Sequence, residues 1–302
     1  MWSELYDLHS HSTHSDGLHS VEFVASLMSN SGVRFWSLTD HDTIAGWMQA
    51  NAACNDLNMT FIPGVEITCE PGLPSDDLAL AALNLKRPSK SWHLLAYFPE
   101  IMKDSSQLDV LAKWLDPLRE SRIPRMKKMI QKLNDLGFEI NFEDVQRKAS
   151  GSLGRPHLAE IMVDLGYVSD KNEAFEKWIG DGMPAHVSQS KPTIEEAVQL
   201  VKSLGGVTSL AHPAYYGVPV EILTTYCRQI GVDGIEAFHR SHPDFYRFQI
   251  WEECKKQSLS VSCGSDFHGT DYGHSPGRMP VPVSGLHAPV SYTHLRAHET
   301  LT

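Results

Sequence analysis

The first residues that could do chemistry are two histidines near the start of the chain. Residues 7–11 read Asp-Leu-His-Ser-His, and an extended segment turns the side chains of His9 and His11 to the same side. Two imidazoles placed in this way can bind one metal ion. Asp16 follows in the same predicted loop and adds a carboxylate.

Histidines and carboxylates recur wherever a predicted strand ends. The candidate metal ligands are His9, His11, Asp16, His41, Glu66, His93, His212, Asp266 and His268. A set of imidazoles and carboxylates without a thiolate suits Zn²⁺, Mn²⁺ or Fe²⁺ better than Ca²⁺ or an iron–sulfur cluster. The set is large enough for two or three ions.

Each motif alone has a plainer interpretation. A single histidine such as His93 or His212 is more often a hydrogen-bonded structural residue than a ligand. Asp40 and Asp42 could equally be ligands themselves or residues that support a turn or orient a ligand. The repetition of such groups at successive strand ends is what favours a metal site.

The elements that must position these groups alternate short β-branched runs with amphipathic helical segments, which is typical of α/β proteins with a parallel sheet. We predict strands at residues 5–9, 34–39, 60–68, 92–98, 206–211, 234–238 and 259–263. So many units favour closure into a barrel. Functional groups of such barrels lie just beyond the C-terminal ends of the strands, and most of the candidate ligands fall at these positions.

The pattern divides the chain into four segments. Residues 1–100 and 190–288 carry the strand–helix alternation and are predicted to form the two parts of the barrel. Residues 101–189 are helical in pattern and punctuated by glycines, so we expect a helical insertion domain. Residues 289–302 show no hydrophobic period, and we expect them to be a non-native tail.

The composition is that of an ordinary globular protein, with 302 residues of which 41% are hydrophobic and 21% charged. The sequence has no apolar run of about 18 residues and no secretory signal pattern at its start. Its five cysteines form no CxxC pair, which is typical of reduced thiols. We therefore expect a cytoplasmic protein with no membrane contact. The net charge of −11 disfavours a protein that coats nucleic acid through bulk charge.

In their order along the chain, these motifs resemble those of the PHP (polymerase and histidinol phosphatase) superfamily of metal-dependent phosphoesterases. The resemblance rests on DLHSHS at 7–12, SDG at 15–17, LTDHDT at 38–43, PGVEI at 63–67, AHP at 211–213 and GSDFHG at 264–269. Within the superfamily, the chain is similar to a bacterial group of 3′,5′-nucleoside bisphosphate phosphatases and 5′→3′ exoribonucleases.

The resemblance implies an α/β fold, a distorted (β/α)7 barrel with a helical insertion, and a site for up to three divalent ions. In the family pattern Glu66 bridges two ions. The remaining ligands divide into His9, His11 and Asp266 at one, His93 and His212 at another, and Asp16, His41 and His268 at the third. Manganese is the expected metal, with Zn²⁺, Fe²⁺ and Mg²⁺ as alternatives. The segment between Glu66 and His93 is longer than the family's usual hairpin, which could alter substrate access.

Such ions suit the hydrolysis of phosphate esters. They neutralise phosphate oxygens, lower the pKa of a bound water to about 7 and stabilise the leaving alkoxide. We therefore expect a metal-bound hydroxide as the nucleophile. The expected catalytic residues are Glu66, Asp266 and His268, the last two also as groups that could transfer a proton.

Phosphates beyond the reacting one need cationic partners, and the predicted insertion supplies them. Arg155 and His157 flank Pro156 at a predicted helix start, where backbone N–H groups and an arginine can both bind phosphate. His239 follows the sixth predicted strand and could border the mouth of the barrel, although a structural histidine at the rim is the plainer interpretation. Three further arginines recur three residues apart, where a solvated helix surface is the plainer interpretation for each: Arg119, Arg122 and Arg125.

The sequence thus predicts a metal-dependent phosphoric ester hydrolase acting on 3′,5′-nucleoside bisphosphates and, as a 5′→3′ exonuclease, on the 5′ end of short RNA. No protein partner is predicted. One alternative is a phosphatase of another small metabolite, such as histidinol phosphate. Another is a non-catalytic PHP-like binding module, from which ligands would be missing, whereas every expected ligand position here carries a residue that can bind metal.

Overall fold

Two β-sheets form the centre of the molecule in the computed structural model, which describes residues 6–73, 91–149, 153–188, 190–270 and 275–277. The first sheet is parallel and has the order β1 (Tyr6–Asp7), β2 (Phe35–Trp36), β3 (Thr60–Phe61). The second has the order β4 (Gly64–Cys69), β5 (Trp92–Tyr97), β6 (Val207–Leu210), β7 (Gly234–His239), β8 (Ser260–Gly264). The predicted α/β fold class is confirmed.

The two sheets meet along both edges. At one seam, the Leu8 N–H donates to the Cys263 carbonyl at 3.1 Å, and Ser10 forms an isolated bridge with Phe267. At the other, the Glu66 N–H donates to the Thr39 carbonyl at 3.2 Å. Among the described residues the strands form a distorted, barrel-like arrangement instead of one continuous closed sheet. The loops that follow β1, β2 and β8 are thereby brought together.

The expectation of a wholly parallel sheet is wrong for one strand. β5 runs antiparallel to both of its neighbours, β4 and β6. A strand buried on both faces reads as an apolar run whichever way it points, so the pattern of residues 92–97 carries no directional signal. As a result His93 lies opposite Thr68, near the start of its strand but at the end of the sheet where the neighbouring strands place their ligands.

A further difference concerns the predicted strand at residues 60–68, which the structure divides into β3 and β4. Pro63 stands between them and has no N–H to donate to a sheet ladder. The break lets the chain leave the first sheet and enter the second. The predicted tail at 289–302 and most of the long segment between Glu66 and His93 lie outside the described residues.

Helices cover the sheets and pack on them in two hydrophobic clusters, one of which gathers Val21, Met28 and Ala50 around Trp36. These helices are α1 (Val21–Asn30), α2 (Trp47–Asp56), α4 (Ser105–Glu120), α9 (Ile194–Ser203), α10 (Val220–Ile230) and α11 (Asp244–Gln257), with short turns η2 (Ile101–Lys103) and η4 (Pro213–Tyr216). Local signals explain several starts: Ser20 caps α1 by accepting from the Phe23 N–H, and Thr193 with Glu196 forms a capping box on α9.

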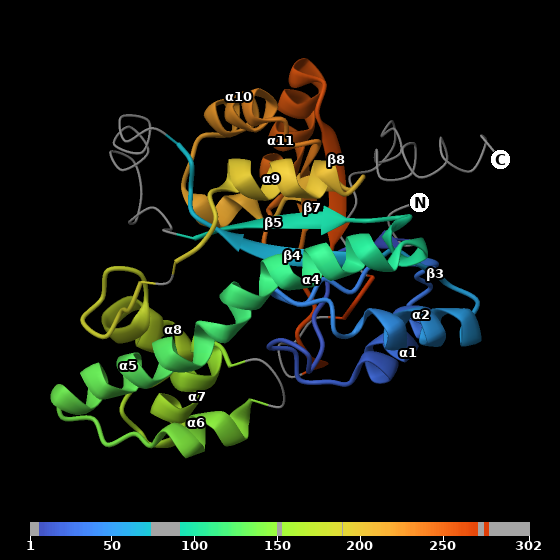
Figure 1. Ribbon diagram of the computed structural model, residues 1–302. Helices are drawn as coiled ribbons and strands as arrows, with labels where there is room; N and C mark the ends of the chain where they lie inside the picture. The colour runs from blue at the N-terminus through green and yellow to red at the C-terminus, as the bar shows by residue number, and fades with distance from the viewer. Residues whose placement is uncertain (1–5, 74–90, 150–152, 189, 271–274, 278–302) are drawn as a thin grey trace.

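A second group of helices forms a lobe beside the sheets (Figure 1). It consists of α5 (Arg122–Asp135), α6 (Phe142–Lys148), α7 (Arg155–Asp164), α8 (Lys171–Ala174) and η3 (Phe175–Ile179). Its buried residues, from Met126 to Ala185, form their own cluster. The buried face of α4 packs instead in the core of the sheets through Leu111, Leu115 and Leu118. The helices from α5 to η3 therefore form a separately packed unit. Within the part of the chain that the structure describes, no helix is long and apolar enough to cross a membrane.

Candidate metal centre and substrate pocket

The loops after β1 and β8 hold the first candidate ligands. The His11 N–H donates to the Phe267 carbonyl at 2.9 Å, and the Asp266 N–H donates to the His9 carbonyl at 2.8 Å. These backbone bonds turn three side chains inward. Nε2 of His9 and of His11 lie 3.4 and 3.3 Å from Oδ1 of Asp266.

Glu66 occupies the centre of the cluster and is fully buried. Its Oε2 lies 3.2 Å from Nε2 of His9, 3.2 Å from Nε2 of His11 and 3.1 Å from Nδ1 of His41. Its Oε1 lies 2.8 Å from Nδ1 of His93 and 3.0 Å from Nε2 of His212. One carboxylate therefore faces imidazoles on both of its oxygens, which is the arrangement a bridging ligand requires.

Asp16 gathers the remaining histidines. Its Oδ1 lies 3.3 Å from Nε2 of His268 and 3.9 Å from Nδ1 of His11. Its Oδ2 lies 3.8 Å from Nε2 of His41. The side chains fall into four overlapping groups whose ligand atoms lie within 4.8 Å of one another: His11, Asp16, His41 and His268; His9, Glu66 and His212; His9, His11 and Asp266; and His41, Glu66 and His93.

The donor atoms themselves fit a metal better than a purely hydrogen-bonded cluster. Among the described residues, five buried atoms in this cluster have no hydrogen-bond partner: Nε2 of His9, Nε2 of His11, Oδ1 of Asp16, Nδ1 of His41 and Oε2 of Glu66. Buried polar atoms without partners are costly, because they have lost their bonds to water. These atoms point at one another across short gaps, as ligands around a cation would. Ligation by the set stays a prediction.

The electrostatics of the cluster keep its carboxylates ionised. Burial alone would raise the pKa of Glu66, but His41, His9 and His93 hold that pKa well below its usual range. The same balance of burial against nearby histidines lowers the pKa of Asp16 and of Asp266. Burial lowers the pKa of His41 to about 3, against the raising effect of Glu66. The pKa of His11 is raised to about 10 and that of His9 is also raised, because the nearby carboxylates outweigh the lowering effect of burial. A divalent cation bound by these rings would displace their protons.

Three buried aspartates orient the loops that carry the ligands. Asp40 accepts from the N–H and the hydroxyl of Ser12, each at 2.7 Å, and from the Ser15 hydroxyl at 2.5 Å. Asp7 accepts from the N–H of Ser265 at 2.9 Å. Asp42 accepts from the N–H of Thr68 at 2.8 Å. Asp40 and Asp42 thus have the supporting role that the sequence left open.

The backbone of the site departs from ordinary conformations. Three non-glycine residues at the cluster have a positive φ: Asp42 (55°), His212 (26°) and Asp266 (50°). Residues other than glycine adopt such angles at a cost, usually of about 1–3 kcal/mol, and they do so mainly at functional sites. Two of the three, His212 and Asp266, are candidate ligands. Hydrogen bonds to the surrounding chain keep them in these strained conformations.

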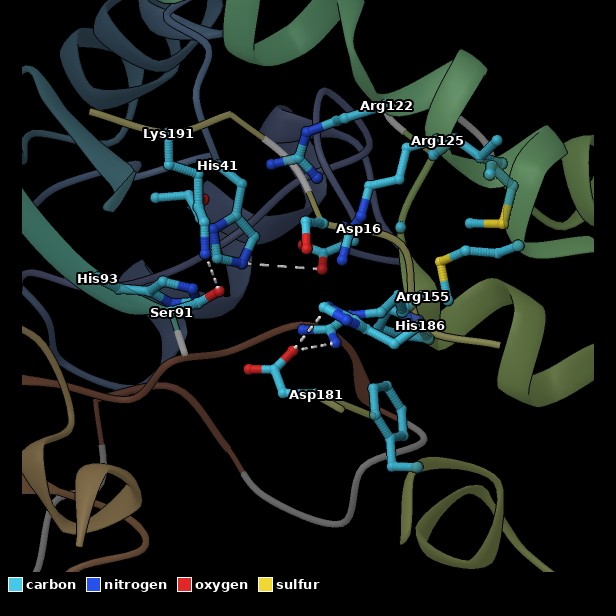
Figure 2. A pocket seen from close by; sticks show the side chains of 18 of the residues that line it. Asp16, His41, Ser91, His93, Arg122, Arg125, Arg155, Asp181, His186 and Lys191 are labelled. Atoms are coloured by element: carbon cyan, nitrogen blue, oxygen red, sulfur yellow. Dashed lines mark hydrogen bonds and ion pairs between the residues drawn. The ribbon is translucent and has the colours of Figure 1, made fainter. Parts of the chain in front are cut away.

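A pocket of about 850 Å³ opens between the ligand cluster and the helical lobe. Asp16, His41 and His93 form the wall on the cluster side. The pocket is also lined by the cations Arg122, Arg125, Arg155 and Lys191 and by Asp181 and His186. Lys191 lies beside His41 and His93, whereas Arg155 and Asp181 lie across the pocket from them (Figure 2). Apolar side chains complete it: Met126, Met129, Leu153, Pro156 and Phe175. The pocket therefore joins a candidate metal centre to an anion-attracting surface.

The cations are held in place by neighbours that differ from one to the next. Arg155 donates to Oδ1 of Asp181 at 2.8 Å, and Lys191 donates to the Ser91 hydroxyl at 2.7 Å. Arg125 donates to the Val187 carbonyl at 2.8 Å. Burial lowers the pKa of Arg125 to about 10, and the nearby positive charges of Arg155 and Arg122 add to the effect. An anion in the pocket would relieve this repulsion.

Of the three predicted substrate-binding residues, one lines the pocket and two do not. Arg155 lines the pocket. His157 is buried and its Nδ1 accepts the Gly154 N–H at 3.1 Å, so its ring closes the start of α7 and is not part of the pocket wall. His239 is fully buried, with Nδ1 at 2.7 Å from the Ser241 hydroxyl and Nε2 at 3.3 Å from Oδ2 of Asp266. It supports a candidate ligand and does not border the pocket.

Sequence reasoning missed several residues of the site. Asp181, His186 and Lys191 line the pocket, but they come from a stretch without any motif. Glu236 is fully buried beside His9, and one signal could have revealed it: a charged residue inside the apolar strand at residues 234–239. Of the three spaced arginines, Arg122 and Arg125 line the pocket, whereas Arg119 is half-exposed and pairs with Asp116.

Known proteins resemble this chain in fold and, at a lower level, in sequence. Residues 7–120 match the family model of the PHP domain. A 5′-3′ exoribonuclease of Haemophilus influenzae is 29% identical over 266 residues, which cover 87% of this chain and 89% of that protein. A 3′,5′-nucleoside bisphosphate phosphatase of Chromobacterium violaceum is 28% identical over 287 residues, covering 91% and 93%.

A solved structure adds to the comparison. An amidohydrolase from Chromobacterium violaceum, determined with bound sulfate and without metal, has a TM-score of 0.80 at 26% identity. The match covers 96% of this chain and 95% of that one. Together with the order of the motifs and the cluster of imidazoles and carboxylates, these matches indicate a hydrolase whose residues 7–120 are similar to the PHP domain.

Proposed function

We propose that this protein is a metal-dependent phosphoesterase that removes phosphate from 3′,5′-nucleoside bisphosphates and cleaves short RNA from its 5′ end. The observation that carries the proposal is the pocket itself. Asp16, His41 and His93 of the ligand cluster line it together with four cationic side chains, of which Arg155 lies across the pocket from His41 (Figure 2). A substrate with two phosphates could place one at the cluster and the other at the cations across from it.

In this proposal the imidazoles and carboxylates of the cluster bind two or three divalent ions, with Mn²⁺ as the first candidate. The proposed ligands are His9, His11, Asp16, His41, Glu66, His93, His212, Asp266 and His268. Ions bound there supply Lewis-acid chemistry by neutralising the oxygens of the phosphoryl group. The absence of thiolates from the set suits Mn²⁺, and the unpartnered buried atoms of the cluster support metal binding.

Glu66, Asp266 and His268 are the proposed catalytic residues. Glu66 links the groups of the cluster through both of its oxygens. The side chains of Asp266 and His268 are 10% and 17% exposed, whereas those of His9 and His11 are fully covered. Asp266 and His268 therefore keep some accessible surface, although neither is among the described residues that line the pocket, so their catalytic role stays a prediction.

The cations of the pocket would bind the phosphate that does not react. Arginine binds phosphate through paired N–H groups, and Arg122, Arg125 and Arg155 line the same pocket as Lys191. Phe175 and Met126 in the same pocket offer an apolar surface to a nucleobase. A small monophosphate such as histidinol phosphate has no second phosphate for these cations.

The test is a parallel assay on protein loaded with Mn²⁺. We expect efficient hydrolysis of 3′-phosphoadenosine 5′-phosphate and of short 5′-phosphorylated RNA, with kcat/KM for histidinol phosphate lower by at least about tenfold, since one charge-assisted contact is worth about 1.5–3 kcal/mol. The control is Glu66→Ala, which removes the central carboxylate and should abolish turnover of every substrate. Efficient turnover of histidinol phosphate alone would show that the proposed substrate class is wrong.

A further inference from the structure

A buried carboxylate outside the proposed ligand set touches it at two points. Glu236 lies in the middle of β7 and is fully buried. It belongs to none of the four groups of candidate ligands found among the described residues. A charged group in such a position is costly unless it is fully paired, so its partners show what it does.

Each oxygen of Glu236 has its own partner. Oε1 lies 3.0 Å from Nδ1 of His9, and Oε2 accepts the backbone N–H of His212 at 2.8 Å. Burial alone would raise the pKa of Glu236, but the nearby His9 and His239 hold it below its usual range. One carboxylate therefore joins two ligand-bearing loops, the one after β1 and the one after β6.

The contact with His9 determines which ring nitrogen can bind a metal. Nε2 of His9 faces the cluster, at 3.2 Å from Oε2 of Glu66 and 3.4 Å from Oδ1 of Asp266. A neutral imidazole that ligates through Nε2 carries its proton on Nδ1. Oε1 of Glu236 is placed to accept that proton in a hydrogen bond, which fixes both the tautomer and the ring orientation.

The contact with His212 holds a strained backbone. His212 has φ 26° and ψ 58°, a conformation that L-residues seldom adopt. Its N–H bond to Oε2 of Glu236 secures that conformation, which brings Nε2 of His212 to 3.0 Å from Oε1 of Glu66. The carboxylate thus sets the position of a second candidate ligand through the main chain.

The neighbouring strand leaves room for this arrangement. A Cβ atom at Gly264 in β8 would lie 2.2 Å from Cβ of His9 and 2.8 Å from Oε1 of Glu236. Only glycine fits there without a shift of the backbone or of the His9–Glu236 pair. The absence of a side chain at Gly264 therefore makes room for the contact between His9 and Glu236.

We propose that Glu236 is a positioning residue of the metal centre, which holds His9 for ligation through Nε2 and His212 in its strained conformation. This inference rests on the metal site of the proposed function. Groups that orient metal-binding histidines typically contribute about 10–100-fold to metal affinity. Glu236 supplies this orientation to two ligands at once, one through a ring nitrogen and one through a peptide N–H.

Glu236→Gln tests the proposal at nearly constant shape. The His212 N–H can only donate, so the glutamine oxygen must face it and the amide NH₂ then faces Nδ1 of His9. The amide N–H of the glutamine then faces the Nδ1–H that His9 must carry to ligate through Nε2, and two donors cannot form a hydrogen bond. We expect Mn²⁺ to bind this variant about 10–100-fold more weakly and purified protein to retain fewer ions per chain, as measured by calorimetry and elemental analysis.

The matched control is Glu253→Gln, which changes a largely buried glutamate of α11 that pairs with Lys256. It should bind Mn²⁺ like the wild type. Circular dichroism of the metal-free proteins checks folding. If Glu236→Gln does not fold, Glu236→Asp serves instead, because its shorter carboxylate cannot reach both partners and should also weaken Mn²⁺ binding.

The outcomes separate the two proposals. Wild-type affinity for Mn²⁺ in a folded Glu236 variant would overturn the positioning role while leaving the metal site intact. Failure of the wild type itself to bind Mn²⁺ would overturn the metal site of the proposed function. Weakened binding in the Glu236 variant, with normal binding in Glu253→Gln, is the result expected from the positioning role.

Discussion

The cations of the pocket are partly neutralised by the protein itself. Arg155 pairs with Asp181, whose Oδ1 also lies 3.4 Å from Nε2 of His186 (Figure 2). Arg122 pairs with Asp42. A phosphate entering the pocket must therefore compete with, or add to, existing ion pairs. Affinity depends on how much positive charge remains after this pairing.

Arg155→Met isolates the contribution of one such cation. The substitution keeps the apolar stem but leaves Asp181 without its arginine, which makes the wall more negative. We expect KM for a nucleoside bisphosphate to rise about tenfold or more, because charge-assisted hydrogen bonds contribute about 1.5–3 kcal/mol. The kcat for p-nitrophenyl phosphate, which has no second phosphate, should stay unchanged in steady-state kinetics.

Arg147→Met is the control for Arg155→Met. Arg147 is 78% exposed on α6 and pairs with Asp144, away from the residues that line the pocket. Its replacement should leave both kinetic constants as they are. A variant at Arg155 with an unchanged KM would show that this arginine does not contact the substrate, whatever its place in the wall.

Local signals predict helices here better than strand directions. The N-cap at Ser20 and the capping box at Thr193 are short-range patterns, and both mark the observed helix starts. The direction of β5 depends on which edge of the sheet receives it, and a buried apolar run does not encode this. His93 still lies beside Glu66, but the strand that carries it runs in the direction opposite to the expected one.

The start of α5 is fastened to the sheets by a buried ion pair. The Arg122 side chain is 13% exposed and pairs with Asp42, which is fully covered and also accepts from Thr68. Arg122→Met leaves that carboxylate without a cation, and such losses usually cost about 3–5 kcal/mol. We expect a decrease of about 3 kcal/mol in the free energy of unfolding, measured by urea denaturation.

Two further variants check this assignment to the ion pair. Arg119→Met removes an exposed arginine of α4 and should change the free energy of unfolding by less than about 1 kcal/mol. The double variant Arg122→Met with Asp42→Asn removes both charges and should be less destabilised than the sum of the two single changes. Additive effects would mean that the pair is not coupled.

At the scale of the whole chain, the sequence reveals those residues of the site that lie directly after the ends of strands. His9, His11 and Asp266 can be recognised because each lies in a short motif directly after a strand. Asp181 belongs to the site only because the helical lobe packs against the sheets, and Lys191 because the chain before α9 runs beside Glu70, just after β4. No local pattern records either contact. The net charge of −11 is equally silent about the cluster of cations in the pocket.

The hydrophobic cluster of the lobe is separate from the clusters of the sheets, so we expect that metal binding and substrate recognition can be separated. Among the described residues, the core of the sheets includes none between Leu118 and Ile194, and the core of the lobe lies between Met126 and Ala185. Arg125 contacts the Val187 carbonyl at 2.8 Å, so a short Gly/Ser linker can replace residues 126–186. We expect cooperative unfolding and wild-type Mn²⁺ content in this variant, with hydrolysis of p-nitrophenyl phosphate retained and KM for a bisphosphate raised at least about tenfold, as Arg155 is lost. Loss of Mn²⁺ from a folded variant would show instead that the lobe helps to build the metal centre.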